Sequence, residues 1–200
     1  MKIRIKRQAA PNEVPYWSCI EYHGDGNISV ADWLADVNAT VLDFNRIAIE
    51  CSCLEGRCGA CALRVNSRPA LACRVKLRDA VKNNEIILEP LKKFPVLKDL
   101  VVDRSQMHRQ MLELKLWPRG MAECAQDLRI EASMCLLCGC CLDTCPRYGT
   151  GTFPGPAAIV QAYASGKPLS AVTISTCLRD FSCMHVCPAG IPIKKFIDLI

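Results

Sequence analysis

The sequence predicts an α+β protein in which a small sheet domain precedes a mainly helical, cysteine-rich domain. Three observations lead to this prediction. Residues 1–90 carry short alternating patterns typical of strands around one helical pattern. Helical spacing dominates from residue 105 onward. The 15 cysteines, apart from Cys19 and Cys124, fall into three groups, over 51–73, 135–145 and 177–187.

Residues 1–90 are expected to form a small sheet with a single helix. Ile3 and Ile5 alternate with lysine and arginine, as in a strand with one buried face. Ser29 is placed to cap a helix over 30–38, which has Asp32 in its first turn. The other strands are predicted at 16–22, 62–65, 69–72 and 85–89. This succession of elements indicates a β-grasp type of domain.

The segment 91–104 is expected to connect this domain to a second one over 105–200. Apolar residues recur at helical spacing from Ser105 up to Trp117-Pro118, which predicts a first helix. A second helix is expected over 156–165, and 191–200 is expected to be an amphipathic tail. The rest of this domain should consist of loops and short helices around the cysteines.

The cysteines indicate metal or redox chemistry rather than disulfide bonds. A secreted disulfide scaffold is normally shorter and follows a signal peptide. This sequence begins with the charged stretch MKIRIKR and has no apolar segment directly after it. No stretch approaches the roughly 18 apolar residues of a membrane span. We therefore expect a cytoplasmic chain without a transmembrane segment, whose reduced thiols are available as ligands.

The first cysteine group has the spacing of a plant-type [2Fe–2S] ferredoxin domain. It reads Cys53-x4-Cys58-x2-Cys61, with Cys73 as the fourth thiol. A loop rich in glycine and alanine can wrap a cluster closely, so that its amide groups point at the sulfur atoms. Structural zinc prefers paired CxxC units, so this spacing would be unusual for zinc. Cys51 has no place in the pattern, and we interpret it as a small buried hydrophobe.

The second and third groups form an internal repeat of the kind found in two-cluster bacterial ferredoxins. The runs are Cys135-x2-Cys138-x2-Cys141-x3-Cys145-Pro146 and Cys177-x2-Asp180-x2-Cys183-x3-Cys187-Pro188. In such ferredoxins the fourth cysteine of each run ligates the cluster of the other run. A [4Fe–4S] cluster is therefore expected on Cys135, Cys138, Cys141 and Cys187. Zinc is the alternative occupant of such a pattern.

The second cluster of this domain is expected on Cys145, Cys177 and Cys183. Three thiolates alone hold a [3Fe–4S] cluster, because a fourth iron has no ligand. Asp180 stands where the repeat lacks a cysteine. Since a carboxylate is a harder ligand than a thiolate, it would hold a second [4Fe–4S] form only weakly. The other interpretation of Asp180 is a solvated side chain. Cys140 is not needed as a ligand by either cluster, and we expect it to be buried.

Neither nucleic-acid binding nor substrate chemistry is predicted for this chain. Its formal charge is +5, but three clusters of about −2 each would bring the loaded protein to about −1. No basic stripe with interleaved aromatic residues is present. The sequence also lacks a glycine-rich dinucleotide fingerprint and a nucleophile–base–acid set. The cofactors are thus expected to do the redox work.

These residues make the chain similar to the iron–sulfur subunit of succinate dehydrogenase and fumarate reductase. The similarity extends over nearly the whole chain. It is carried by the loop CSCLEGRCGAC with Cys73, the connector FPVLKDLVVD, the run CLLCGCCLDTCP with its doubled Cys140-Cys141, and the run Cys177-x5-Cys183-x3-Cys187-Pro188.

The resemblance implies a subunit of an oxidoreductase complex. Its partner would be a flavoprotein that carries FAD and interconverts succinate and fumarate. Electrons would pass in line through [2Fe–2S], [4Fe–4S] and [3Fe–4S] clusters. In the family, the last cluster meets a quinone at the junction with a membrane anchor subunit, which places such a chain peripherally on the inner face of the cell membrane.

Two positions near the expected quinone site depart from the family. The family usually has tryptophans shortly after the first Cys-Pro, where this sequence reads Arg147-Tyr148-Gly149-Thr150. The residue after the first cysteine of the last run is often histidine, but here it is Leu178. An alternative function is therefore an iron–sulfur subunit of another flavin-dependent organic-acid or heterodisulfide reductase with a non-quinone acceptor. A zinc-stabilised interaction module is a third reading, from a different class.

Overall fold

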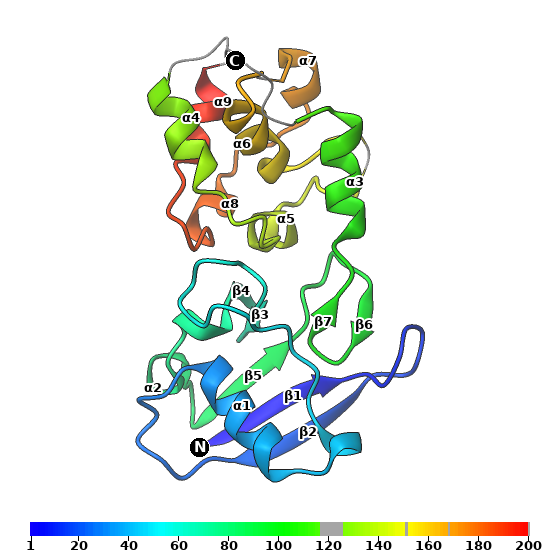
Figure 1. The fold of residues 1–200 in the computed structure, drawn as a ribbon, viewed down its shortest axis with the longest axis vertical. Coiled ribbons are helices and arrows are strands. Elements are labelled where there is room, and N and C mark those ends of the chain that lie inside the picture. The colour runs from blue at the N-terminus through cyan, green and yellow to red at the C-terminus, as the bar shows by residue number, and fades with distance from the viewer. Residues whose placement is uncertain (117–125, 151, 168, 200) are drawn as a thin grey trace. The chain divides into compact units, whose positions relative to one another are not determined.

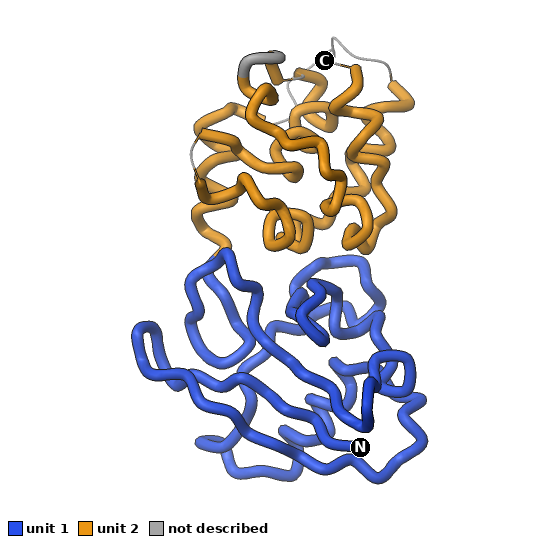
Figure 2. The backbone as a smooth tube through the Cα atoms, turned by 180° about the vertical axis from the view of Figure 1, so that it is seen from behind, with its two compact units in different colours: residues 1–103 blue, residues 104–200 orange. Residues whose placement is uncertain are grey.

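The chain divides into two compact units, residues 1–103 and residues 104–200 (Figure 2). The computed structural model describes residues 1–116, 126–150, 152–167 and 169–199. The segment 91–104 was expected to connect two domains. Its residues 91–103 belong to the first unit, and Arg104 belongs to the second.

The first unit contains a mixed sheet with the strand order β2-β1-β5-β3-β4 (Figure 1). The central strands β1 and β5 run parallel, and the other neighbours are antiparallel. The predicted strands and their order along the chain are confirmed. Their bounds are Lys2–Arg7 (β1), Tyr16–Glu21 (β2), Ala62–Val65 (β3), Arg68–Leu71 (β4) and Glu85–Glu89 (β5).

The predicted helix is α1 (Val30–Thr40), and it begins at the expected residue. The Ser29 hydroxyl accepts a hydrogen bond of 3.1 Å from the amide of Asp32, which satisfies one of the free amides of the first turn. Leu34 of this helix is fully buried, as are Ile3 and Ile5 of β1 and Ile86 and Leu88 of β5. The remaining short elements of the sheet unit are 3-10 turns at Asp43–Asn45 and Ala72–Arg74 and helix α2 (Leu77–Ala80).

The end of the first unit is a β-hairpin that sequence reasoning did not find. It consists of β6 (Val96–Lys98) and β7 (Val101–Val102), and Asp99 lies in its turn at φ +47°. The Asp99 carboxylate is buried and accepts hydrogen bonds from the amides of Gln8 (3.0 Å) and Ala48 (2.9 Å). Its Oδ1 atom also lies 2.8 Å from Nε of Arg7, as an ion pair without the alignment of a hydrogen bond. Asp99 therefore ties the hairpin to strand β1 and to the segment before the first cysteine loop.

Seven helices and the cysteine loops between them are found in the described parts of the second unit. They are α4 (Gln126–Ser133), α5 (Cys140–Thr144), α6 (Pro156–Ala164), α7 (Ala171–Ile174), α8 (Ser182–His185) and α9 (Ile193–Asp198), after the leading helix α3 (Ser105–Glu113). The predicted first helix thus ends earlier than expected, because Lys115 adopts φ +55° and the amide of Leu116 turns back to the Met111 carbonyl. Trp117-Pro118 lies outside the described residues.

Helix α6 is the buried centre of the second unit. It packs against α4 and α9, and its Tyr163 ring meets the Phe196 ring of α9 at a centroid distance of 4.9 Å. Gly155 precedes the helix at φ +89°, where a side chain would collide with Leu142 of α5. No helix within the described ranges is long and apolar enough to cross a membrane. The helices instead form a small core on which the cysteine loops are mounted.

We expect Asp99→Ala to lower the free energy of unfolding by about 3–5 kcal/mol, because it leaves the buried Arg7 guanidinium and two amides without their partner. Urea unfolding followed by tryptophan fluorescence measures the change. The matched control is Asp43→Ala, whose carboxylate pairs with Arg46 at 2.9 Å but is 88% exposed. An exposed pair contributes about 0–1 kcal/mol. Equal losses in the two variants would show that Asp99 has no special role.

Candidate iron–sulfur cluster sites

The first cysteine loop arranges four thiols in two pairs. The sulfur atoms of Cys61 and Cys73 are 3.3 Å apart, although the second of them comes from beyond the β3–β4 hairpin. The side chain of Cys53 is hydrogen-bonded to that of Cys58. Each pair can hold one iron, so the donor set fits a binuclear cluster with two thiolates on each metal.

Backbone conformation in this loop turns amide groups toward sulfur. Leu54, Gly56 and Gly59 all have positive φ angles (54°, 73° and 75°). The amides of Glu55 and Arg57 consequently donate to Sγ of Cys53, at 3.4 and 3.2 Å. A loop whose amides converge in this way favours negative charge, which is what a cluster with its thiolates carries.

The thiols of the first loop differ in acidity. The amide of Arg57, followed by that of Glu55, lowers the pKa of Cys53 to about 6. Burial, and then the adjacent Cys61, raises the pKa of Cys73 to about 12. Cys51 was predicted to be a buried hydrophobe, and this is wrong, because the segment before the loop lies at the surface and leaves the side chain exposed. Partial desolvation raises the pKa of its thiol to about 11.

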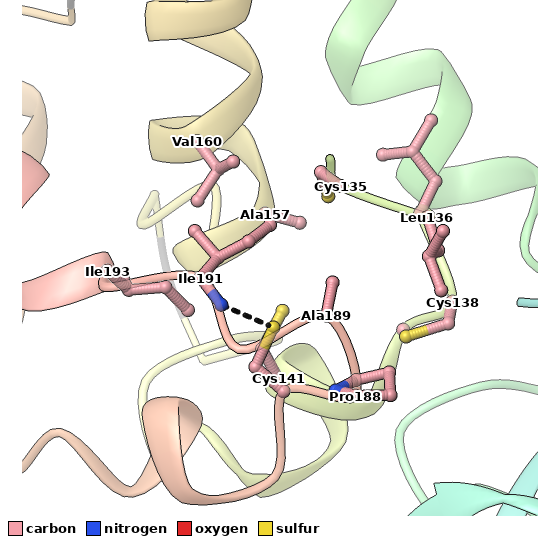
Figure 3. A pocket seen from close by; sticks show the side chains of 13 residues that line it. Cys135, Leu136, Cys138, Cys141, Ala157, Val160, Pro188, Ala189, Ile191 and Ile193 are labelled. Atoms are coloured by element: carbon pink, nitrogen blue, oxygen red, sulfur yellow. Dashed lines mark hydrogen bonds between the residues drawn. The ribbon is translucent and has the colours of Figure 1, made fainter. Parts of the chain in front are cut away.

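The thiols of the first run and one thiol of the second run surround a common cavity. It is lined by Cys135, Cys138, Cys141 and Cys187, and Figure 3 shows apolar side chains such as Val160 and Ile191 around it. The amide of Ile191 donates to Sγ of Cys187 at 3.4 Å. Four thiols around an apolar cavity fit a cluster of several irons, since thiolates bind iron and the apolar wall excludes water.

Burial dominates the chemistry of these thiols. It raises the pKa of Cys141 well above the ordinary value, with further contributions from the neighbouring thiols Cys138 and Cys135. Burial likewise raises the pKa of Cys135. Ionising Cys135 and Cys141 is therefore unfavourable without a metal that neutralises them. The site is suited to a bound cation cluster and poorly suited to free thiolates.

A second group of thiols lies around Cys183. Burial raises the pKa of its thiol to about 12, with further electrostatic contributions from Cys145, from Cys177 and from the Asp180 carboxylate. Cys145 and Cys183 are buried, Cys177 is half-buried, and Asp180 is exposed. The structure therefore brings together three thiols and one carboxylate from both runs.

Cys140 is fully buried, as the sequence predicted. The sequence did not predict the hydrogen bond between the thiol of Cys140 and Cys138. This hydrogen bond is the main reason why the pKa of Cys138 is lowered to about 7. The doubled Cys140-Cys141 was visible in the sequence. The contact with Cys138 depends on the turn at Gly139 (φ +87°), which sequence spacing does not reveal.

Two family models match the two parts of the chain. A 2Fe-2S iron-sulfur cluster binding domain matches residues 2–109, more than half of the chain, and a 4Fe-4S dicluster domain matches residues 134–192. The fold and the cysteine sites thus define an iron–sulfur electron-transfer protein with a [2Fe–2S] domain followed by a dicluster domain.

The chain belongs to the family of succinate dehydrogenase iron–sulfur subunits, as the resemblance predicted. It is 30% identical to the succinate dehydrogenase iron-sulfur subunit of Bacillus subtilis, over 96% of this chain and 88% of that protein. Members of this family transfer electrons as subunits of an oxidoreductase complex.

Two further proteins are similar over almost the entire chain. An uncharacterized iron-sulfur protein of Methanocaldococcus jannaschii is 29% identical over 96% of this chain, which spans 41% of that longer protein. A chain of the Mycobacterium smegmatis Sdh1 complex in the apo form matches with a TM-score of 0.75 at 22% identity, covering 96% of this chain and 89% of that one. This last likeness shows that the fold is shared.

In the cluster-free chain, we expect Cys53 to be alkylated faster than Cys51 at neutral pH. A thiolate is the reactive species, and Cys53 ionises above a pKa of about 6, whereas Cys51 stays protonated up to about 11. Mass spectrometry after short iodoacetamide pulses measures both rates between pH 5 and pH 9. The rate at Cys53 should level off above about pH 7, about one unit above its pKa, and that at Cys51 should keep rising. Identical profiles would contradict the loop geometry.

Proposed function

We propose that this chain relays electrons between a FAD-containing flavoprotein and a quinone or membrane anchor in a succinate dehydrogenase or fumarate reductase complex. The single observation that carries the proposal is the cavity shared by three thiols of the first run and Cys187 of the second run. This crossing is the arrangement of a two-cluster ferredoxin, in which two clusters lie close enough to pass electrons. Membership of the succinate dehydrogenase family supports the choice of complex.

Each cluster has a distinct set of proposed ligands. The [2Fe–2S] cluster takes Cys53, Cys58, Cys61 and Cys73. The [4Fe–4S] cluster takes Cys135, Cys138, Cys141 and Cys187. A [3Fe–4S] cluster takes Cys145, Cys177 and Cys183. When bound, these groups supply one-electron chemistry, and the chain provides thiolates, amide hydrogen bonds and an apolar surrounding that set their potentials.

In the proposed relay, each of the two units contacts one class of partner. The [2Fe–2S] domain would meet the flavoprotein, and the dicluster domain would meet the acceptor through an anchor subunit. A chain of this kind lies peripherally at the inner face of the cell membrane. The relative named above, from Bacillus subtilis, is itself a succinate dehydrogenase subunit, which supports this set of partners.

Anaerobic purification of the native complex through a tag on this chain tests the proposal. The complex should contain a flavoprotein. Succinate should reduce the cluster signals in EPR spectra, and fumarate should reoxidise them. Reduction by dithionite but not by succinate would contradict the proposed substrate pair, while leaving the cluster assignment intact.

A second candidate is a reductase for another organic acid or for a heterodisulfide, with a non-quinone acceptor. It is favoured by the Methanocaldococcus relative, in which the similar region is less than half of a longer protein. It is also favoured by Arg147 to Thr150 and Leu178, which stand where the family usually has tryptophans and a histidine. Leu178 is 61% exposed. Reduction of the clusters by a dithiol, but not by succinate, would select this candidate.

We expect Cys140→Ala to lower the midpoint potential of the [4Fe–4S] cluster by about 40 mV. The thiol of Cys140 is hydrogen-bonded to the ligand Cys138, and a donor to a ligand sulfur stabilises the reduced, more negative cluster. One hydrogen bond contributes about 1 kcal/mol, and a tenfold change in a one-electron equilibrium is 59 mV.

Redox titration of this EPR signal measures the shift. Cys140→Ser retains a donor and should restore most of the potential, which separates a hydrogen bond from a packing effect. Cys51→Ala is the control, because that thiol is exposed and belongs to the other unit. An unchanged potential in Cys140→Ala would overturn the assignment of this hydrogen bond.

A further inference from the structure

The repeat preserves its backbone at the position where it loses a cysteine. In the first run, Leu137 and Gly139 flank Cys138 with φ angles of +50° and +87°. In the second run, Arg179 and Phe181 flank Asp180 with φ angles of +53° and +54°. In both runs the residue after this central position precedes a short helix, α5 or α8. Asp180 therefore occupies the same local conformation as a cysteine that lines the neighbouring cavity.

The hydrogen bond to the first thiol of each run is preserved as well. The amide of Arg179 donates to Sγ of Cys177 at 3.4 Å. In the first run, the amide of Leu137 is hydrogen-bonded to Cys135. The two turns thus share the amide hydrogen bond to their first thiol, while their central side chains differ in exposure, since Cys138 is buried and Asp180 is exposed.

This conformation is costly in the second run. Arginine and phenylalanine rarely adopt positive φ angles, in contrast to the glycine of the first run. Both residues are held by α9, since Arg179 pairs with Asp198 at 3.4 Å and the ammonium group of Lys194 lies 5.7 Å from the centre of the Phe181 ring. Strain that the surroundings maintain in this way points to a function for the residue it positions.

The Asp180 carboxylate lies beside the thiols and has no competing partner among the described residues. It acts electrostatically on Cys183, as do Cys145 and Cys177. No hydrogen bond or ion pair to Asp180 is found in the part of the chain that the structure describes, and its neighbour Arg179 is engaged by Asp198. An oxygen donor is thus available at the corner of a three-thiol set.

We propose that Asp180 ligates a removable fourth iron, so that the second cluster of this unit converts between a three-iron and a four-iron form. The inference rests on the proposed function only in requiring a cluster on Cys145, Cys177 and Cys183. Its new element is a fourth protein ligand for this cluster, the Asp180 carboxylate, which would bind one further ferrous ion.

The conversion balances in iron, sulfur and electrons. A one-electron reductant, supplied by the relay or by dithionite, first takes the [3Fe–4S]⁺ form to [3Fe–4S]⁰. Uptake of one Fe²⁺, with water leaving the ion and Asp180 binding it, then gives [4Fe–4S]²⁺. In reverse, an oxidant such as ferricyanide removes one electron. Fe²⁺ then dissociates, and the cluster that remains is [3Fe–4S]⁺. Because oxygen binds iron less tightly than thiolate does, the fourth iron is the one that exchanges.

The consequence is a relay whose last cluster responds to ferrous iron. Filling the site changes the charge and the ligand set of the cluster, and both determine its potential. Electron flow to the acceptor would therefore depend on the supply of Fe²⁺ as well as on the reductant. A cysteine at this position would fix the four-iron form and remove that dependence.

The experiment uses the native complex, kept anaerobic, with ⁵⁷Fe²⁺ as the probe. The complex is oxidised with ferricyanide, desalted, reduced with dithionite, incubated with ⁵⁷Fe²⁺ and desalted again. Wild type should show the EPR signal of an oxidised three-iron cluster at the first stage, lose it after reconstitution, and retain one ⁵⁷Fe per chain. Its Mössbauer spectrum should show that iron in a cluster with an oxygen ligand. A second ferricyanide treatment should release it.

Variants separate the role of the carboxylate from adventitious iron binding. Asp180→Ala should keep the three-iron signal and retain no ⁵⁷Fe, whereas Asp180→Cys should retain iron that ferricyanide does not release. Asp127→Asn removes an exposed acid of α4 and should behave as wild type. Undiminished [2Fe–2S] and [4Fe–4S] signals show that each variant is folded.

Equal ⁵⁷Fe retention by wild type and Asp180→Ala would overturn the proposal, and so would the absence of retention in wild type. A four-iron cluster in the untreated wild type that becomes three-iron in Asp180→Ala would support it. These readouts do not involve succinate, so failure of the proposed substrate pair leaves this test unaffected.

Discussion

The second unit depends on the approach of Cys187 to the thiols of the first cysteine run. The crossing brings α8 against α5 and lets both runs enclose one cavity. Helices α5 and α8 contain five and four residues, far fewer than the roughly 12–15 at which an isolated helix becomes stable. Packing must therefore stabilise them, α5 against α6 and α8, and α8 against α9. The proposed ligation of metal would add to this, because metal binding contributes directly to the free energy of folding.

The first unit is stabilised differently. Its sheet and α1 form an apolar core, and the buried Asp99 joins the β6–β7 hairpin to β1 and to residue 48, shortly before the cysteine loop. The loop then presents its amides to Cys53 through local backbone conformation alone. Consequently the geometry of this site is set by hydrogen bonds within the polypeptide. In the second unit, by contrast, burial raises the pKa of Cys135 and Cys141, so that a bound cation would favour their ionisation.

Local patterns predicted what depends on local sequence. Strand periodicity predicted the sheet, and Ser29 predicted the start of α1. Cysteine spacing predicted the groups of thiols that lie together in the structure. The β6–β7 hairpin was missed because the partners of Asp99 are distant in the sequence. Gln8 lies 91 positions before it and Ala48 lies 51 positions before it. The exposure of Cys51 depends on tertiary packing, and the contact between Cys140 and Cys138 depends on the backbone turn at Gly139. Spacing alone defines neither.

The repeat combines a preserved backbone with a changed donor atom, and this combination explains why its two halves can differ in function. If only the backbone had diverged, the second run would have lost the fourth ligand position altogether. If neither had diverged, both clusters would hold four irons with similar strength. In the proposed site, a carboxylate would retain the ligand position but would bind iron more weakly than a thiolate, because oxygen is the harder donor. The asymmetry of the dicluster unit therefore lies in ligand chemistry, while α9 maintains the conformation that makes the two positions equivalent.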